Sequence, residues 1–249
     1  KLGVFATSKV GYAIIKELVK NDADVRCLIV DDKDDMCPQI MNEGSSCTIY
    51  NYSDLGDPRI LCSLNDLNLD LGILAWWPYI VKKPIIDLFS QGIINTHPSF
   101  LPYNRGKHYY FWNIVEQVPF GVSIHYVDEN IDHGDIAFQK RIDVSWEDRG
   151  VDLWEKVQDE IIQLFHTHIE EILTGNIPRI RQNYEKGSFH YGYESERLLE
   201  IDLEKNYKAR ELINIIRGFS GFEYKYPHFY ENGKKFCINI QIKEKEDGS

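Results

Sequence analysis

Short apolar runs, separated by amphipathic segments, constrain the fold of this chain more than any other feature of its sequence. The run Val25–Val30 is apolar except for Arg26, and Leu71–Ala75 carries no polar side chain. Such runs are typical of strands that are buried on both faces of a parallel sheet. Between the runs, apolar residues recur at helical spacing, as in Val10–Leu18 and the longer Asp148–Leu173. This alternation predicts an α/β fold with a doubly wound, mostly parallel sheet.

The last part of the chain has a different pattern, and its composition changes near Arg181. Tyr207–Arg217 predicts a short helix. Asn232 and Gly233 lie between two apolar arms, and this pair is the strongest local signal for a β-hairpin. We therefore expect a large domain at residues 1–180 and a small C-terminal α+β domain with a β-hairpin at residues 181–249.

The charge distribution limits the partners of the chain. Its 249 residues carry a formal net charge of −11. From Arg181 onward, twelve Lys and Arg balance twelve Asp and Glu, so the acidic excess lies before that residue. A nucleic-acid partner would need a basic face, and we expect none. No apolar run approaches the roughly 18–20 residues of a membrane helix, so we expect no membrane partner.

The cysteines and the first residues bear on the cellular compartment. Five cysteines are an odd number, and no two of them have Cys-x-x-Cys spacing. This usage disfavours a disulfide framework or a zinc site. Leu2–Ala6 predicts a first strand rather than a signal peptide. We therefore expect reduced thiols in a cytoplasmic protein.

The stretch Ile93–Gly106 carries the clearest functional signal. It opens with a short apolar run that predicts a buried strand, and Pro98 ends this strand. Asn95 and His97 are two positions apart, so their side chains leave the strand on the same face. Ligands of open α/β sheets bind at the carboxyl ends of strands. An amide beside an imidazole there can hold a developing oxyanion and move a proton.

A second stretch follows the alternating strand predicted at Phe120–Tyr126. The segment Val127–Asp135 carries Asp132 directly before His133 and Gly134. A carboxylate near an imidazole can orient the ring and stabilise its charged form. Taken singly, each polar residue of the two stretches also has an ordinary interpretation, as a residue that hydrogen-bonds within a turn or loop.

Two separated blocks of the sequence resemble the 10-formyltetrahydrofolate-dependent formyltransferases. The blocks are Asn95-Thr-His97-Pro-Ser-Phe-Leu-Pro, and Gly121-Val-Ser-Ile-His125 with Ile131-Asp-His-Gly-Asp135. This family includes methionyl-tRNA formyltransferase, glycinamide ribonucleotide transformylase and the sugar N-formyltransferases. The resemblance implies a Rossmann-like fold, and it implies that Asn95, His97 and Asp132 form a catalytic trio.

Further segments make the chain most similar to the nucleotide-sugar N-formyltransferases. These segments are Pro102–Lys107, Phe111-Trp112, Gly187–His190 and the tail from Ile201 to Tyr230. The resemblance implies transfer of a formyl group from 10-formyltetrahydrofolate to the amine of a nucleotide-linked amino-dideoxy sugar. The sugar is expected to be dTDP-linked and to serve surface polysaccharide or O-antigen (lipopolysaccharide) biosynthesis. The resemblance also implies a homodimer, with the hairpin packed against the second copy.

The resemblance assigns residues to the two substrates. In this family the loop after the strand Leu71–Ala75 helps to bind the pterin. The residues expected to contact the folate are Trp77, Pro78, Tyr79, Ile80, Asp128 and Ile131. Those expected to contact the nucleotide sugar are Ser8, Lys9, Trp76, Arg105, Lys107, His108, Tyr224 and Tyr226.

Several of these residues have equally ordinary interpretations. The turn at Ser8 and Lys9 lacks a Gly-x-Gly-x-x-Gly fingerprint, which disfavours a nicotinamide cofactor. Its helix N-terminus either holds a phosphate or forms a plain βα turn. At least one of Trp76 and Trp77 is expected in the core. Arg105 either meets a diphosphate or bonds nearby carbonyls, and the aromatic residues of the tail either stack on a base or fill the small domain.

In the chemistry that the trio implies, Asn95 donates to the oxyanion, His97 takes the proton of the amine, and Asp132 orients the imidazole. We expect no metal, because the sequence offers no local cluster of metal ligands. Three alternatives stay open: a 10-formyltetrahydrofolate hydrolase, a formyltransferase for another amine such as glycinamide ribonucleotide or methionyl-tRNA, and a binding module without activity. Family hydrolases usually carry an additional N-terminal domain, whereas this chain opens on its first predicted strand.

Overall fold

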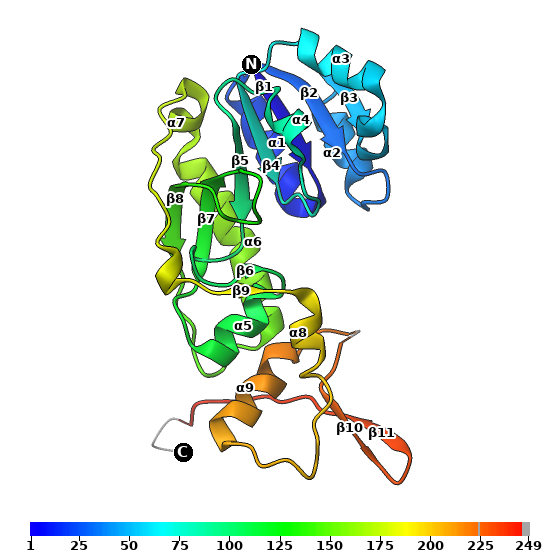
Figure 1. Ribbon diagram of the computed structural model, residues 1–249, viewed down its shortest axis with the longest axis vertical. Coiled ribbons are helices and arrows are strands. Elements are labelled where there is room, and N and C mark those ends of the chain that lie inside the picture. Colours follow the sequence, from blue (N-terminus) through cyan, green and yellow to red (C-terminus); the bar gives the residue numbers. More distant parts are fainter. Residues whose placement is uncertain (224, 246–249) are drawn as a thin grey trace. The chain divides into compact units, whose positions relative to one another are not determined.

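The structure is a computed structural model that describes residues 1–223 and 225–245 (Figure 1). The chain forms two compact units. The first unit comprises Lys1–Pro98, Val122–Lys140 and Asp159–Gln182, and the second comprises Ser99–Gly121, Arg141–Gln158 and Asn183–Ser249. The domain boundary predicted at residue 180 lies near the last passage between the units. Two earlier segments also group with the second unit, so the division into domains 1–180 and 181–249 stays a prediction.

A seven-stranded sheet organises the first unit within the described residues. Its strand order is β3-β2-β1-β4-β5-β7-β8. The strands are β1 (Leu2–Ala6), β2 (Val25–Val30), β3 (Thr48–Asn51), β4 (Leu71–Ala75), β5 (Ile93–His97), β7 (Gly121–Tyr126) and β8 (Ile136–Arg141). The pairs among β1 to β5 are parallel, whereas β5 and β7 are antiparallel. The predicted α/β fold with a mostly parallel sheet is confirmed.

Helices connect and flank these strands (Figure 1). They are α1 (Ser8–Lys20), α2 (Cys37–Glu43), α3 (Pro58–Asp66), α4 (Lys83–Ile86) and α7 (Ile169–Thr174), with a 3₁₀ helix η1 at Tyr52–Gly56. Helix α6 (Gly150–Thr167) belongs to this unit from Asp159 onward. The single helix predicted at Asp148–Leu173 is divided at His168. The backbone of His168 is not helical, with φ −110° and ψ 19°, and its ring stacks on Phe138 at 3.8 Å between centroids.

The strands of the first unit are apolar because both faces of the sheet are covered. Val4, Ile29 and Ile73 have no or almost no exposed surface. Gly72 of β4 lies against Ile93 of β5, where a Cβ atom would meet the Ile93 side chain at 2.7 Å. This close packing fixes β5, the strand that carries Asn95 and His97. Within the described residues, none of the helices combines the length and apolar character needed to cross a bilayer.

The second unit contains shorter elements. They are β6 (Arg105–Gly106), α5 (Tyr109–Glu116), η2 (Tyr184–Lys186), β9 (Phe189–His190), α8 (Gly192–Glu196), α9 (Ala209–Phe219), β10 (His228–Glu231) and β11 (Lys234–Cys237). Helices α5 and α9 pack together, and Phe111 stacks on Phe219 at 4.2 Å between centroids. Strands β10 and β11 form the predicted hairpin, with positive φ at Asn232 and Gly233 as a type I′ turn requires.

Candidate active site

The antiparallel pairing of β5 and β7 builds the floor of the site. Asn95 lies opposite His125, and His97 lies opposite Ser123. Directly opposed residues share a face of the sheet, as do residues two apart on one strand. Asn95, His97 and His125 therefore project on the same side. Thr96 points to the other side, where its hydroxyl donates to the Leu74 carbonyl at 3.0 Å.

The structure brings the three predicted catalytic side chains together. His97 Nδ1 lies 3.4 Å from Asp132 Oδ1, and His125 Nε2 lies 3.8 Å from the same oxygen. Asn95 Nδ2 lies 3.1 Å from His125 Nε2. The two imidazole side chains are 7% and 2% exposed and the Asp132 side chain is 13% exposed. The negative charge of Asp132 therefore interacts with both rings in a largely buried site, where charge interactions are stronger than in water.

Asp132 is held in place by the backbone of its turn. Its φ is 51°, in the left-handed region. The side-chain amide of Gln182 donates to the carbonyls of Asp132 at 3.0 Å and of Gly134 at 2.7 Å. Gly134 packs directly on the Tyr126 backbone, where a Cβ atom would meet the carbonyl carbon at 2.7 Å and the oxygen closer still. The turn therefore requires glycine at 134, and the geometry of the turn determines where the Asp132 carboxylate lies.

His125 is a site residue to which the sequence analysis gave no role. Its Nδ1 lies 2.7 Å from the Tyr126 carbonyl, so this nitrogen must carry the proton. Burial lowers the pKa of His125 to about 4, and the ring is therefore neutral near pH 7. Its Nε2 lone pair then accepts a hydrogen bond from Asn95 Nδ2. This contact orients the Asn95 amide and leaves its second N–H for a substrate oxygen.

The register of β5 on β7 is the signal that identifies His125. A one-residue shift of that pairing would turn His125 to the opposite face of the sheet. In the sequence only the family resemblance marks the block Gly121–His125, because the pairing of the two strands cannot be read from the chain.

The same three side chains also form a group of metal-type ligands. One nitrogen each of His97 and His125 and one oxygen of Asp132 lie within 4.8 Å of one another. The sequence showed no such cluster because the residues come from β5, β7 and the following turn. The expectation that the reaction needs no metal stays a prediction.

The predicted folate-contacting loop lies in the first unit, after β4. Trp77 is a core residue: its ring packs edge-on against Phe5 and Tyr52, each at 5.4 Å between centroids. Tyr79 stacks on Tyr52 at 4.1 Å and donates to Asp31 at 2.5 Å. The Trp77 side chain is therefore part of the core. A contact of the Trp77 backbone with the pterin stays a prediction.

The other predicted folate contacts are more accessible. Pro78 and Ile80 are exposed, with Ile80 at 70%. Trp76, which is a predicted nucleotide-sugar contact on the same loop, is half-buried with φ 58°. Asp128 accepts from the Asn130 backbone and pairs with His133 at 2.9 Å, while Ile131 is 44% exposed. These two residues share the turn of Asp132, so a ligand at Asp132 would have them nearby.

The start of α1 favours the plain βα turn over a phosphate site. The Ser8 backbone N–H faces both carboxylate oxygens of Asp34 at 3.1 Å. This internal anion occupies the position that a phosphate would take at the helix N-terminus. Lys9 is exposed and pairs with Asp159 at 3.6 Å.

The remaining predicted contacts belong to the second unit. The Arg105 guanidinium lies over the Tyr184 ring at 5.2 Å, and Lys107 is exposed. His108 Nδ1 lies 2.5 Å from Ser195 Oγ, and burial lowers the pKa of His108 to about 4. His108 is therefore neutral near pH 7 and adds no charge for a diphosphate. Tyr226 is half-buried, and Tyr224 lies outside the described residues.

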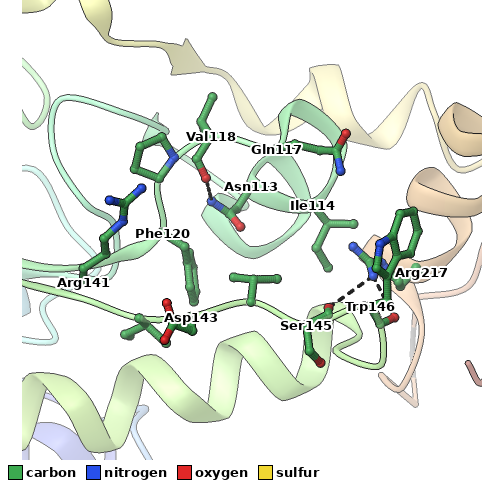
Figure 2. Close-up of a pocket in the computed structure, with 13 residues that line it drawn as sticks. Asn113, Ile114, Gln117, Val118, Phe120, Arg141, Asp143, Ser145, Trp146 and Arg217 are labelled. Carbon is green, nitrogen blue, oxygen red and sulfur yellow. Dashed lines mark hydrogen bonds between the residues drawn. The ribbon is translucent and has the colours of Figure 1, made fainter. Parts of the chain in front are cut away.

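A cavity of about 380 Å³ lies within the second unit, and the sequence gave no indication of it (Figure 2). Arg217 and Trp146 lie at one side of it, and Arg141 and Asp143 at the other. Arg217 is only 4% exposed and lies 4.7 Å from the Trp146 ring centroid. The full lining is Asn113, Ile114, Gln117, Val118, Pro119, Phe120, Arg141, Ile142, Asp143, Val144, Ser145, Trp146 and Arg217.

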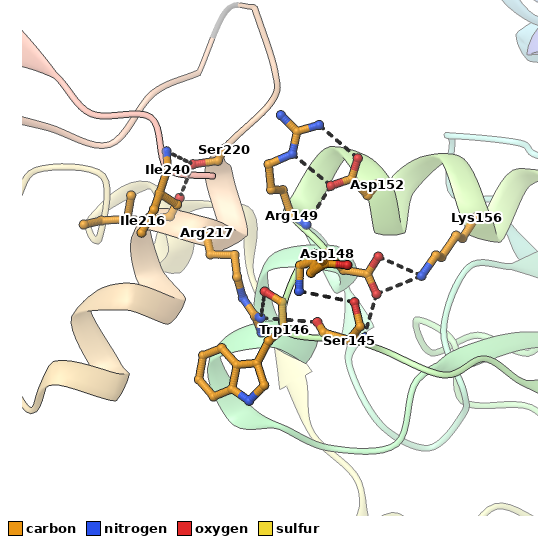
Figure 3. A network of polar contacts seen from close by, with 11 residues as sticks. Ser145, Trp146, Asp148, Arg149, Asp152, Lys156, Ile216, Arg217, Ser220 and Ile240 are labelled. Carbon is orange, nitrogen blue, oxygen red and sulfur yellow. Dashed lines mark hydrogen bonds and ion pairs between the residues drawn. The ribbon is translucent and has the colours of Figure 1, made fainter. Parts of the chain in front are cut away.

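A polar network beside this cavity explains the position of Arg217 (Figure 3). Its Nη1 donates to the carbonyls of Ser145 at 3.3 Å and Trp146 at 2.7 Å. Asp148 accepts from the Ser145 backbone at 2.7 Å and pairs with Lys156 at 2.7 Å. Arg217 thus joins α9 to the segment before α6, which is a structural role.

The chain belongs to the formyl transferase family. The family described as "Formyl transferase" matches residues 2–169, which is more than half of the chain. A second family, described as "N-formyltransferase dimerization C-terminal domain", matches residues 194–244. The sequence-based recognition of a formyltransferase is confirmed.

Two solved structures and one curated relative illustrate the similarity. A 4-N formyltransferase from Francisella tularensis superposes with a TM-score of 0.81 at 26% identity, over 98% of each chain. A formyltransferase from Anoxybacillus kamchatkensis, in complex with UDP-4,6-dideoxy-4-formamido-L-AltNAc and tetrahydrofolate, has a TM-score of 0.57 at 26% identity, over 76% of this chain and 98% of that one. The tetrahydrofolate in that complex agrees with the predicted folate co-substrate.

The curated relative is the methionyl-tRNA formyltransferase of Fusobacterium nucleatum. It is 30% identical over 173 residues, which are 69% of this chain and 55% of the relative. The chain thus spans little more than half the length of this curated relative.

Proposed function

We propose that this chain transfers the formyl group of 10-formyltetrahydrofolate to the amine of a nucleotide-linked amino-dideoxy sugar. The observation that carries the proposal is the buried cluster of Asn95, His97, His125 and Asp132 at the carboxyl end of β5. It combines an oriented amide donor, an imidazole and a carboxylate. These groups suit acyl transfer to an amine, because one can hold the oxyanion and two can move and balance a proton.

The cluster supports the following sequence of events. The amine nitrogen attacks the formyl carbon, and the carbonyl electron pair moves onto oxygen. The free N–H of Asn95 donates to this oxyanion, a contact typically worth about 3–4 kcal/mol. His97 takes the proton that the amine loses, and Asp132, 3.4 Å away, stabilises the charged ring. Collapse breaks the bond to the folate nitrogen, which takes up a proton and leaves as tetrahydrofolate.

The proposed acceptor rests on coverage and charge. The chain aligns with 98% of the 4-N formyltransferase from Francisella tularensis but with 55% of the methionyl-tRNA formyltransferase. Its C-terminal part has equal numbers of acidic and basic residues, whereas a tRNA-binding part would need a basic face. A dTDP-linked sugar is proposed from the family resemblance, with surface polysaccharide or O-antigen synthesis as its use.

We also propose a cytoplasmic homodimer. Phe229 and Phe236 stack across the hairpin at 5.3 Å, and Phe236 is 44% exposed. A two-stranded hairpin is marginally stable alone, so a second copy is its natural support. The family match at residues 194–244 favours the same role. Light scattering at micromolar concentration tests this, and a monomeric mass would contradict it.

A panel of acceptors tests the activity. The enzyme is incubated with 10-formyltetrahydrofolate and with dTDP-, UDP- and GDP-linked amino sugars, glycinamide ribonucleotide or charged initiator tRNA. Formation of an N-formyl sugar is expected. Formate release without any acceptor would indicate a hydrolase instead. Inert amino sugars together with a formylated ribonucleotide or tRNA would disprove the acceptor assignment, and His97→Asn controls for background transfer in each case.

A further inference from the structure

The three ligand atoms of the catalytic cluster have the spacing of a metal site. Zinc forms bonds of about 2.0–2.1 Å to histidine nitrogen and carboxylate oxygen, so its tetrahedral ligands lie about 3.3 Å apart. The distances from Asp132 Oδ1 to His97 Nδ1 and His125 Nε2 are 3.4 and 3.8 Å. All three atoms lie within 4.8 Å of one another. Small side-chain movements would therefore place them around one cation.

The surroundings of these ligands are also those of a metal site. A histidine that binds a metal almost always donates its other ring N–H to a carbonyl or carboxylate. His125 does so, since its Nδ1 donates to the Tyr126 carbonyl at 2.7 Å and its Nε2 faces the cluster. Asp132 is held through the contact of its backbone with Gln182. His125 and Asp132 are thus oriented before any cation arrives.

We propose that His97, His125 and Asp132 bind one divalent transition-metal cation of the zinc class, and that this cation reversibly inhibits formyl transfer. The inhibitory role rests on the function proposed above, because it concerns the same site. Two imidazoles and one carboxylate suit zinc, cobalt and similar cations, whereas magnesium and calcium prefer oxygen ligands alone. Three protein ligands leave a fourth position open to water or to a substrate atom.

Inhibition follows from the electron pairs that the cation would use. The cation would take up His97 Nδ1 and the Asp132 carboxylate that faces it, and its positive charge would oppose the gain of the amine proton by the same ring. The lone pair of His125 Nε2 is no longer available to Asn95 Nδ2, now 3.1 Å away, so the Asn95 amide loses its orienting partner. The cation also occupies the space in which the amine would be deprotonated.

His133 and His166 offer poorer sites. His133 pairs with Asp128 at 2.9 Å, and His166 pairs with Glu17 at 2.9 Å. Each is a two-ligand pair with substantial exposure. Among the described residues, His97, His125 and Asp132 are the group of three whose ligand atoms all lie within 4.8 Å of one another.

Cobalt titration tests the site without relying on activity. Co²⁺ bound tetrahedrally by nitrogen and oxygen ligands gives visible absorption bands, and Zn²⁺ should displace it. The wild-type chain is expected to bind one Co²⁺, and Asp132→Asn and His125→Asn are each expected to weaken binding by about tenfold or more. His133→Asn, a matched substitution on the same turn, should bind like wild type. Urea unfolding of each variant establishes that it is folded.

Several results would overturn the proposal. They are the absence of bound Co²⁺ at millimolar concentration, equal binding by wild type and Asp132→Asn, or loss of binding in His133→Asn. Zn²⁺ should also inhibit the wild-type reaction, and a chelator should restore it; full activity of the zinc-loaded enzyme would disprove inhibition. If the enzyme binds Co²⁺ as expected and yet formylates no acceptor after a chelator has removed all metal, the proposed function fails while the metal site stands.

Discussion

Replacement of Gly134 by Ala should disable the candidate site through the backbone alone. A Cβ atom at this position would lie 2.7 Å from the Tyr126 carbonyl carbon and closer still to its oxygen. The contact to carbon is about 0.7 Å short of the 3.4 Å at which ordinary contact begins. The Tyr126 carbonyl is main chain and a Cβ atom is fixed to the backbone of residue 134, so no side-chain rotation can relieve the overlap. Either the turn of Asp132 or the end of β7 must move.

Both possible movements reach the catalytic cluster. The Tyr126 carbonyl accepts the hydrogen bond from His125 Nδ1, so its displacement releases the ring that orients Asn95. Displacement of the turn instead carries Asp132 away from His97, now at 3.4 Å. A misplacement of about 1 Å can cost about 10²-fold in turnover. Overpacking of a tight contact typically costs about 1–3 kcal/mol of unfolding free energy.

The assay compares turnover and the urea midpoint in three proteins: wild type, Gly134→Ala and Gly56→Ala. Gly56 is the matched control, because a Cβ there has no atom within 4 Å. We expect Gly56→Ala to behave like wild type, and Gly134→Ala to lose about 10²-fold in turnover with a lower midpoint. If Gly134→Ala keeps turnover within about twofold of Gly56→Ala, the backbone contact does not set the site geometry.

Three further predictions follow from individual groups. His97→Asn and Asp132→Asn should each lower turnover by about 10²-fold or more with little change in the urea midpoint, and near-normal turnover in both would refute the proposed proton transfer. The folded-state pKa of His108, about 4, lies below the roughly 6.5 of an exposed histidine, so the unfolded chain binds the proton first. The stability that this neutral ring contributes should be full above about pH 6.5 and be lost as pH falls toward 4. The urea midpoint should therefore fall less steeply with decreasing pH in His108→Asn than in wild type, and an equal slope in the two proteins would refute the assignment to His108. Arg217→Met should destabilise the chain by about 1–3 kcal/mol in urea unfolding, because the partly buried carbonyl of Trp146 loses its donor, whereas exposed Arg210→Met should be nearly neutral.

The parallel half of the sheet was predictable because burial on both faces leaves a direct trace in the sequence. Strands such as Val25–Val30 and Leu71–Ala75 appear where the apolar runs predicted them. The hairpin at Asn232 and Gly233 was predictable for a local reason, since its turn needs positive φ at both residues. These features depend on a few neighbouring residues and on the composition of one segment.

Burial of single side chains was less predictable, because it depends on which distant elements cover them. Trp77 and Trp76 are adjacent, yet Trp77 enters the core beside Phe5 while Trp76 stays half-buried. The basic character of His108 suggested a phosphate contact, whereas its surroundings keep the ring neutral. The turn at Ser8 meets Asp34, twenty-six positions away, through a contact that no local pattern announces.

The catalytic cluster combines both situations. Asn95 and His97 were found from the chain because they belong to one strand and alternate with period two. Asp132 was found through its motif, but its distance from His97 depends on Gly134 and on Gln182 from a remote segment.

His125 required the register of two antiparallel strands, which neither strand encodes alone. That register places Asn95 opposite His125, so that their side chains form a hydrogen bond. It places the Nε2 lone pair of His125 where Asn95 uses it as an acceptor, and the same lone pair, beside Asp132 and His97, would be a ligand for a cation. The arrangement that orients the proposed oxyanion donor is therefore also the arrangement that would make the site sensitive to zinc-class metals.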